Sequence, residues 1–233
     1  MTPRLRSPLP LAPSSHLELG QDAAHHARVL RLAVRDAVTV FDADGGEAPA
    51  EIVSLSPTSL VVALGAITQR AHDAHAPVLI QCVPKGSKLD DIVRAATEAG
   101  VAEIHLALAA RSIARGEARL DRLARIAEEA ARQSEAPRVP RIVAPAPLLQ
   151  VASRAPSSCA RVVLSPRTDA RMRDVLAPSP AWLVIGPEGG LDDAETHALV
   201  ALGFTLARID TYVLRTEHAG PIAVALAREL AGR

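Results

Sequence analysis

The chain has 233 residues, and its 26 Lys and Arg residues balance its 26 Asp and Glu residues, so the formal net charge is zero. With 48% apolar and 22% charged residues, the composition is typical of a globular protein of one or two domains and excludes a disordered chain. No apolar run approaches the ~18 residues that a membrane-spanning helix needs. Two cysteines are too few for a disulfide framework, so a cytoplasmic location is expected.

The charges are unevenly distributed along this neutral chain. Residues 111–141 contain eight arginines against five acidic residues, whereas the only two lysines are Lys85 and Lys88. Aromatic residues make up 2% of the chain, which argues against a surface of stacked aromatic rings for nucleic acid. Charge alone favours ordinary surface alternation over a nucleic-acid site.

The first seventy residues have the pattern of a small β-rich domain. Short alternating runs separated by Asp, Gly and Pro predict strands at 16–19, 36–41, 51–55 and 59–64, with a helical turn at 22–32. Such strands favour a small β-barrel, and the polar segment 66–76 is a plausible linker. We therefore expect a first domain over residues 1–72.

From residue 77 onward, strands alternate with helices. The predicted strands are 77–83, 101–108, 161–165, 181–185 and 204–209, and the predicted helices are 88–99, 117–134, 191–202 and 219–230. This order indicates a parallel α/β sheet with helices on both faces, in a second domain over residues 73–233.

The strongest local motif runs from Ile185 to Asp192, where a glycine-rich loop follows a buried strand and opens a helix. Ligands bind at this place in open α/β sheets, and glycines let the backbone approach them closely. The spacing does not match the dinucleotide fingerprint, and no lysine of a phosphate loop is present. A nucleoside cofactor held by backbone contacts fits better, although a tight strand–helix turn is the alternative.

Two further motifs lie where strands should end. Arg215 and Glu217 precede the last predicted helix at the same sheet edge, where they could act in catalysis or form an ion pair at the helix N-terminus. Lys85 and Lys88 follow the first α/β strand and suit phosphate contacts, or are simply surface residues. No cluster of residues has the spacing of a metal site, so no metal is expected.

Taken in order, these motifs resemble the bacterial small-subunit ribosomal RNA methyltransferase E family, uridine-N3 methyltransferases of the SPOUT class. The resemblance covers nearly the whole chain and rests on an ordered set of short motifs: 24–26, 29–31, 41–47, 84–86, 97–101, 111–112, 133–140, 185–190, 203–204 and 214–217.

The resemblance implies a PUA-like β-barrel followed by an α/β methyltransferase domain with a C-terminal trefoil knot, and a homodimer that acts on 16S ribosomal RNA within the small subunit. It implies S-adenosylmethionine as cofactor, held by Leu164, Ile185, Gly186, Pro187, Glu188, Gly189, Gly190, Ile209, Tyr212 and Leu214.

Catalysis would depend on Arg215, which favours the anion developing at uridine N3 or contacts the adjacent RNA phosphate, and on Glu217, which orients Arg215, caps the helix or assists proton removal. RNA would contact His25, Arg28, Arg31, Lys85, Lys88, Arg94, Arg111 and Arg138.

Several residues depart from the family pattern. At the second cofactor loop, Asp210, Tyr212 and His218 stand where Gly, Arg and Thr are usual. Elsewhere, Ala95 stands where a Lys is usual, and Glu135 and Ala136 stand where Gly and Arg are usual. They keep open two alternatives, an RNA-binding protein with weakened catalysis and the same chemistry on another RNA.

Overall fold

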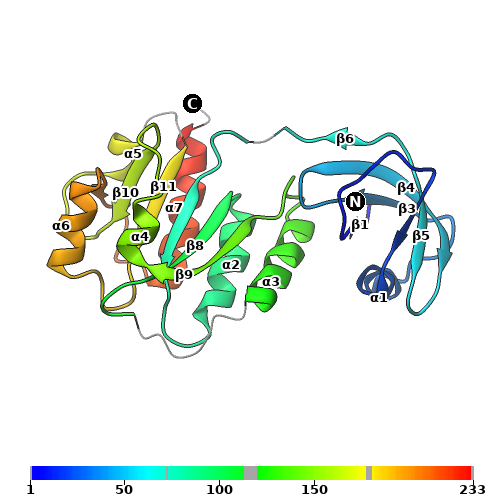
Figure 1. The fold of residues 1–233 in the computed structure, drawn as a ribbon, viewed down its shortest axis with the longest axis horizontal. Coiled ribbons are helices and arrows are strands. Elements are labelled where there is room, and N and C mark those ends of the chain that lie inside the picture. The colour runs from blue at the N-terminus through cyan, green and yellow to red at the C-terminus, as the bar shows by residue number, and fades with distance from the viewer. Residues whose placement is uncertain (1, 72, 113–119, 177–179, 232–233) are drawn as a thin grey trace. The chain divides into compact units, whose positions relative to one another are not determined.

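The computed structural model describes residues 2–71, 73–112, 120–176 and 180–231 (Figure 1). The chain divides into two compact units. The first contains residues 1–72 together with 137–139, and the second contains residues 73–136 and 140–233. Within the described ranges, no helix is long and apolar enough to cross a membrane.

The first unit is a six-stranded mixed sheet with one helix. Its hydrogen-bonded order is β1-β3-β4-β5-β2, with β6 paired to β4, and only the β1–β3 pair is parallel. Helix α1 contacts β1 and β2, the two ends of this order, and so covers strand edges that would otherwise be exposed. The bounds are β1 Arg4–Arg6, β2 His16–Leu19, α1 Gln21–Val29, β3 Ala37–Phe41, β4 Gly46–Leu55, β5 Leu60–Leu64 and β6 Thr68–Gln69.

The predicted β-rich character of the first unit is confirmed, but three strand assignments differ. Strand β4 begins at Gly46, five residues earlier than expected, and contains Pro49. This proline lies between the segment paired with β6 and the segment paired with β5, so its missing N–H removes no bond to either strand. Strands β1 and β6 were not predicted, because two or three residues carry too little periodicity.

A buried carboxylate organises the turn between β3 and β4. Asp42 is 1% exposed and accepts hydrogen bonds from the backbone N–H groups of Leu11 at 2.7 Å, Asp44 at 2.8 Å and Gly46 at 2.7 Å. A buried carboxylate is stable only when its oxygens are hydrogen-bonded in this way. Asp42 therefore connects the N-terminal segment to the β3–β4 turn.

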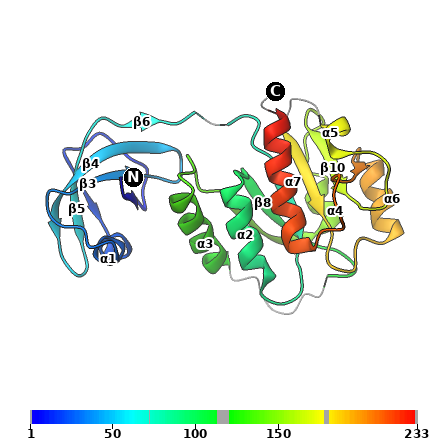
Figure 2. The ribbon, with the colours of Figure 1, turned by 180° about the vertical axis from the view of Figure 1, so that it is seen from behind.

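The second unit is a six-stranded parallel sheet in the order β12-β10-β11-β7-β8-β9. Helices α2, α3 and α7 lie on one face and α4 and α6 on the other (Figure 2). The bounds are β7 Val78–Cys82, α2 Lys88–Glu98, β8 Glu103–Leu108, α3 Leu120–Gln133, β9 Arg141–Pro147, α4 Leu148–Ala152, β10 Ala160–Leu164, α5 Met172–Val175, β11 Ala181–Ile185, α6 Asp193–Ala201, β12 Thr205–Ala207 and α7 Thr216–Ala231.

The central strands β7 and β11 are buried along their whole length, which explains their continuous apolar runs. Strand β9 and helix α4 were not predicted. Strand β9 was missed because it contains Pro145 and Pro147, which are tolerated only at the sheet edge that β9 occupies. Helix α5, of four residues, was also missed. Residues 117–119 of one predicted helix lie outside the described residues.

Asp42→Ala should lower the stability of the first unit by about 3 kcal/mol or more, because three backbone N–H groups would lose their buried acceptor. Hydrogen exchange of the amides of β3–β5 measures this loss. Asp44→Ala, at an exposed position in the same turn, is the control and should leave exchange nearly unchanged. Equal exchange in both variants would contradict the role of Asp42.

Candidate active site at the carboxyl edge of the parallel sheet

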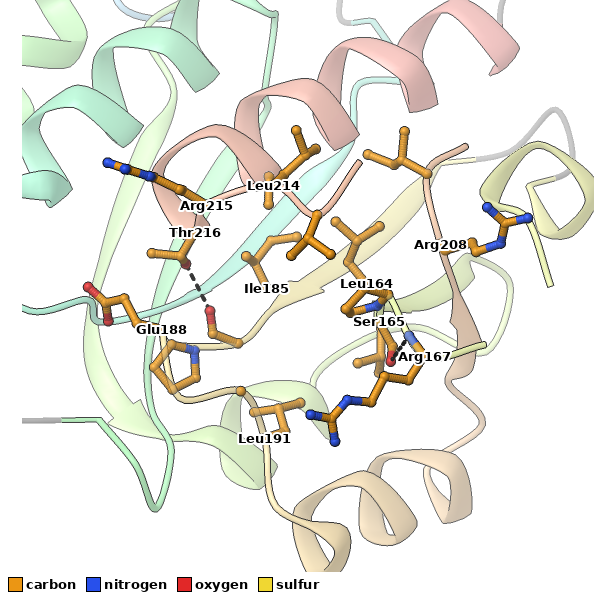
Figure 3. Close-up of a pocket in the computed structure, with 18 of the residues that line it drawn as sticks. Leu164, Ser165, Arg167, Ile185, Glu188, Leu191, Arg208, Leu214, Arg215 and Thr216 are labelled. Carbon is orange, nitrogen blue, oxygen red and sulfur yellow. Dashed lines mark hydrogen bonds between the residues drawn. The ribbon is translucent and has the colours of Figure 1, made fainter. Parts of the chain in front are cut away.

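A pocket of about 650 Å³ lies at the carboxyl ends of β10, β11 and β12 (Figure 3). Parallel pairing of β10 with β11 and β12, and of β11 with β7, brings loops that are distant in sequence to one edge. The pocket is lined by the end of β10, the glycine-rich loop after β11, the segment after β12 and the start of α7. Its position and volume are those of a small-molecule site.

All ten residues predicted to hold a cofactor line this pocket, as do Arg215 and Glu217. Two residues predicted to contact RNA, Lys88 and Arg111, line it as well. The structure thus brings together segments up to about 130 positions apart in the chain, from Lys88 to Glu217. Apolar side chains form much of the wall: Val163, Leu164, Ile185, Leu191, Leu206, Ile209 and Leu214.

The glycine-rich loop needs two of its glycines for geometric reasons. Gly190 has a φ of +69°, in the left-handed region that other residues rarely adopt. A Cβ on Gly186 would lie 3.3 Å from Leu191 Cγ, so that position is also tight. Helix α6 then begins with a capping box, in which Asp192 accepts from the Glu195 N–H and Glu195 accepts from the Asp192 N–H.

A chain of buried side chains fixes this loop to the last helix. The Thr216 hydroxyl donates to the Gly186 carbonyl at 2.9 Å, and Gln81 Nε2 lies 3.4 Å from the same hydroxyl oxygen. Gln81 is fully buried on β7, and Thr216 is 7% exposed. Thr216 was not predicted as a site residue, because the sequence indicated a helix start at Ala219 and thus placed it outside the helix.

Lys88 lies between two carboxylates at one end of the pocket. Its ammonium Nζ is 3.1 Å from Glu188 Oε1 and 3.3 Å from Glu217 Oε2. The Lys85 backbone N–H also donates to Glu188 at 3.1 Å, while the Lys85 side chain is exposed. Lys88 therefore connects the start of α2, the glycine-rich loop and the start of α7.

These contacts shift the pKa values of all three groups toward the charged forms. The Glu188 carboxylate raises the pKa of Lys88, and Glu217 adds to the effect. Partial burial opposes ionisation of Glu188, but backbone N–H groups and Lys88 outweigh it and lower its pKa. The pKa of Glu217 is lowered by its own backbone N–H and further by Lys88 and Arg215.

Arg215 is the exposed cation of this end of the pocket. Its side chain is 81% exposed, and its guanidinium Nη1 lies 4.0 Å from Glu217 Oε1 (Figure 3). Helix α7 begins at Thr216, so Glu217 lies in its first turn, where the helix dipole favours a carboxylate. Glu217 therefore lies both at the helix N-terminus and in the pocket wall.

Arginines at the other end of the pocket were not predicted. Arg167 and Arg208 line it there (Figure 3). Asp210, one of the departures from the family pattern, accepts from Arg208 at 3.0 Å and lies 3.6 Å from Arg171 and 3.9 Å from Arg173. The two loops are joined because the Met172 N–H donates to the Arg208 carbonyl. No sequence motif distinguishes these arginines, because the chain has 24 arginines and an isolated one does not indicate a binding site.

The remaining predicted RNA contacts have varied surroundings. His25 and Arg31 are exposed on and just after α1, whereas Arg28 donates to the carbonyls of Ala24 and Pro57. In the second unit, Arg94 pairs with Asp91, and Arg111 donates to the Gly189 carbonyl at 2.7 Å. Arg138 belongs to the first unit, where its Nε is buried beside Gly45.

Tyr212 and Val213 form the exposed tip of the segment between β12 and α7. Tyr212 is 93% exposed and Val213 79% exposed, although both line the pocket. His218 is also exposed, and its backbone N–H donates to the Arg215 carbonyl. In the part of the chain that the structure describes, no group of three or more His, Cys, Asp or Glu side chains could hold a metal ion.

A parallel α/β unit with a glycine-lined pocket at its carboxyl edge, together with a small β-rich unit, defines a class of two-unit proteins with a ligand pocket at the edge of an open sheet. A model of an RNA methyltransferase domain matches residues 73–228, and a model of an RNA methyltransferase PUA domain matches residues 19–64. The chain belongs to this RNA methyltransferase family.

Individual relatives are named more specifically. The ribosomal RNA small subunit methyltransferase E of Synechocystis is 29% identical over 205 residues, covering 85% of this chain and 67% of that protein. The methyltransferase E of Neisseria gonorrhoeae, crystallised with S-adenosyl methionine, has a TM-score of 0.90 at 25% identity, over 99% of this chain and 98% of that one. A Legionella pneumophila protein crystallised with the same cofactor has a TM-score of 0.88 at 25% identity, over 98% of each chain.

Lys88→Met should lower the melting temperature at pH 7. On acidification, the melting temperature of the variant should fall less than that of the wild type. Folding lowers the pKa values of Glu188 and Glu217. Their contribution to the free energy of unfolding is therefore present above the pKa of about 4.3 in the unfolded chain, and it is lost as the pH falls through their pKa values in the folded protein. Folding raises the pKa of Lys88. The contribution of Lys88 to the free energy of unfolding is therefore complete below about pH 10.4, and it is lost at higher pH. The gap between wild type and variant should therefore be widest between about pH 5 and 10.

Thermal unfolding from pH 3 to 10 measures this gap. Lys85→Met is the matched control, since it removes the neighbouring exposed lysine side chain and keeps the backbone N–H that binds Glu188. If Lys85→Met changed the profile as much as Lys88→Met, the proposed contacts of Lys88 would not be the cause.

Proposed function

We propose that this protein transfers a methyl group from S-adenosylmethionine to N3 of a uridine in 16S ribosomal RNA. The observation that carries the proposal is the pocket at the carboxyl edge of the sheet, with a glycine-rich loop on one side and an exposed cation, Arg215, at its rim. Membership of the RNA methyltransferase family and the two cofactor-bound neighbours support it.

The pocket residues suit S-adenosylmethionine. Leu164, Ile185 and Leu214 give apolar surface for an adenine ring, and the glycine-rich loop exposes backbone groups without a phosphate-binding lysine motif. A Cβ on Gly186 would lie 3.3 Å from Leu191 Cγ, and Gly190 has a left-handed backbone that other residues rarely adopt, so both positions favour glycine. When bound there, the cofactor supplies an activated methyl group on its sulfonium.

The protein then has to align the uridine and favour loss of its N3 proton. The bound cofactor would supply the methyl group that replaces the N3 proton, and the pocket residues would hold it beside the uridine. Arg215 places a positive charge at the pocket rim, where it would stabilise the negative charge developing on the uracil ring. Because base pairing hides N3, the uridine has to be unpaired or flipped out.

Glu217 is better suited to position Arg215 than to remove the proton. Its lowered pKa means that it is ionised at neutral pH and is a weak base. Its Oε2 lies beside Lys88 and its Oε1 faces Arg215, so it holds a cation on each side. By the same contacts, Lys88 would stabilise the site, and the exposed Lys85 side chain is the freer of the two for RNA phosphate.

The RNA would be held by phosphate contacts of arginine and lysine side chains in both units. His25, Arg28 and Arg31 in the first unit, which matches the PUA domain model, and Arg94, Arg111 and Arg138 complete this set. A homodimer, a trefoil knot in the C-terminal part of the second unit, a substrate within the small ribosomal subunit and a cytoplasmic location belong to the same proposal. Residues 1–72 and 73–233 are the proposed RNA-binding and methyltransferase domains.

An RNA-binding protein with weakened catalysis is the second candidate, and Asp210 favours it. This residue replaces the expected glycine with a side chain that is engaged by Arg208. Calorimetry with S-adenosylmethionine separates the candidates, since failure to bind at millimolar cofactor would exclude the enzyme.

Arg215→Ala should lower methyl transfer by about 100-fold or more, with cofactor affinity nearly unchanged, because the variant lacks the exposed cation at the pocket rim that is proposed to stabilise the negative charge on the uracil ring. The assay incubates 16S rRNA or small subunits with S-adenosylmethionine and detects N3-methyluridine by mass spectrometry. Absence of this nucleoside with the wild-type protein would refute the proposed reaction. A large loss of cofactor affinity in Arg215→Ala would instead assign Arg215 to the cofactor.

Thr216→Val should weaken S-adenosylmethionine binding about fivefold, or about 1 kcal/mol, because the Gly186 carbonyl loses its hydroxyl donor and the glycine-rich loop loosens. Thr216→Ser keeps the hydroxyl and should bind as the wild type does. Calorimetry measures both affinities, and equal weakening in the two variants would attribute the effect to packing.

A further inference from the structure

Three residues other than glycine have a left-handed backbone in the described part of the chain: Arg31 with φ +57°, Arg35 with φ +77° and Glu135 with φ +54°. This conformation brings the Cβ close to the following carbonyl and costs a residue other than Gly about 1 kcal/mol or more. Two of the three are arginines, and they lie four positions apart in the first unit.

Arg31 ends α1 in a position that glycine usually occupies. The Leu32 N–H donates to the Ala27 carbonyl at 2.9 Å and the Arg31 N–H to the Arg28 carbonyl at 2.9 Å, which is the Schellman motif. Helices α2 and α6 end with the same pair of bonds, and there the left-handed residues are Gly100 and Gly203. The chain thus uses glycine at this position in two helices and an arginine in α1.

The backbone of Arg35 is held as firmly as that of Arg31. Its N–H donates to the Ile52 carbonyl at 2.8 Å, while Asp36 Oδ2 accepts from the Ala33 N–H at 2.7 Å. These bonds pin both ends of the short segment between Arg31 and the start of β3. Neither arginine can therefore relax into an ordinary backbone conformation without losing main-chain hydrogen bonds.

Both side chains are exposed and lie among exposed apolar residues. In the ranges that the structure describes, the guanidinium groups of Arg31 and Arg35 make no hydrogen bond or ion pair. Their neighbours Val29, Leu30 and Val34 are 63%, 43% and 53% exposed.

We propose that the strained turn at Arg31–Arg35 fixes the backbone from which two unpaired guanidinium groups project, and that both groups bind phosphates of the RNA backbone. Guanidinium is permanently charged and matches phosphate with two parallel hydrogen bonds. The inference rests on the proposed function, adds Arg35 to the RNA contacts, and gives the backbone strain a physical role. The segment lies within the residues that match the PUA domain model.

Replacing either arginine with glycine should stabilise the fold and weaken RNA binding, so the two effects can be measured separately. In the full-length protein, Arg31→Gly and Arg35→Gly should each raise the melting temperature by about 1–4 °C, because glycine removes the left-handed strain. Each should weaken binding to a 16S rRNA transcript about threefold or more and lower the salt slope of binding by about one. Filter binding at several KCl concentrations and thermal unfolding measure the two effects.

Glu135→Gly is the matched control, since Glu135 ends α3 in the same left-handed position with the Ala136 N–H bonded to the Ala131 carbonyl. It should raise the melting temperature and leave RNA binding no weaker. Arg31→Asn, which tolerates the left-handed backbone and lacks the charge, should lose affinity as Arg31→Gly does, excluding loop loosening as the cause.

Two outcomes are distinguishable. If the wild type binds and methylates 16S rRNA but the Arg31 and Arg35 variants bind equally well, this inference is overturned and the proposed function stands. If the wild type does not bind 16S rRNA, the proposed function fails and the inference fails with it.

Discussion

The parallel pairing of β11 between β10 and β7 is the constraint on which the site depends. Parallel strands end at a common edge, so the glycine-rich loop after β11 is placed beside the end of β10 and the start of α2. The Thr216–Gly186 hydrogen bond then fixes the start of α7 against the same loop. Without these two arrangements, the residues of the pocket would belong to unconnected segments.

Electrostatics adds a second level of organisation at this edge. Lys88 lies within 3.3 Å of both Glu188 and Glu217, and it keeps two carboxylates stable where they would otherwise repel each other. The two cations at this end of the pocket differ in their surroundings. Lys88 is engaged by two carboxylates within the protein, whereas the Arg215 side chain is 81% exposed and contacts Glu217 only at 4.0 Å.

Left-handed backbone positions are filled in two ways in the described part of the chain. At Gly190 in the glycine-rich loop the residue is a glycine, which adopts this conformation at little cost. Arg31 and Arg35 in the first unit and Glu135 in the second occupy such positions with a side chain. For Arg31 and Arg35, the proposed binding of phosphate gives this backbone strain a function.

The sequence by itself determined the two-part organisation, the strands and helices with strong periodicity, and the three motifs that meet in the pocket. Those signals are local, since turn residues, apolar alternation and glycine spacing act over a few residues. It did not reveal strand β9, with its two prolines, because only the edge position in the sheet makes them tolerable. Tertiary structure alone decided that Thr216 supports the glycine-rich loop, that Lys88 pairs with Glu188 and Glu217, and that Asp210 faces arginines. Apart from the Asp210–Arg208 pair, these contacts join residues far apart in the chain, and their formation depends on the packing of the whole sheet edge.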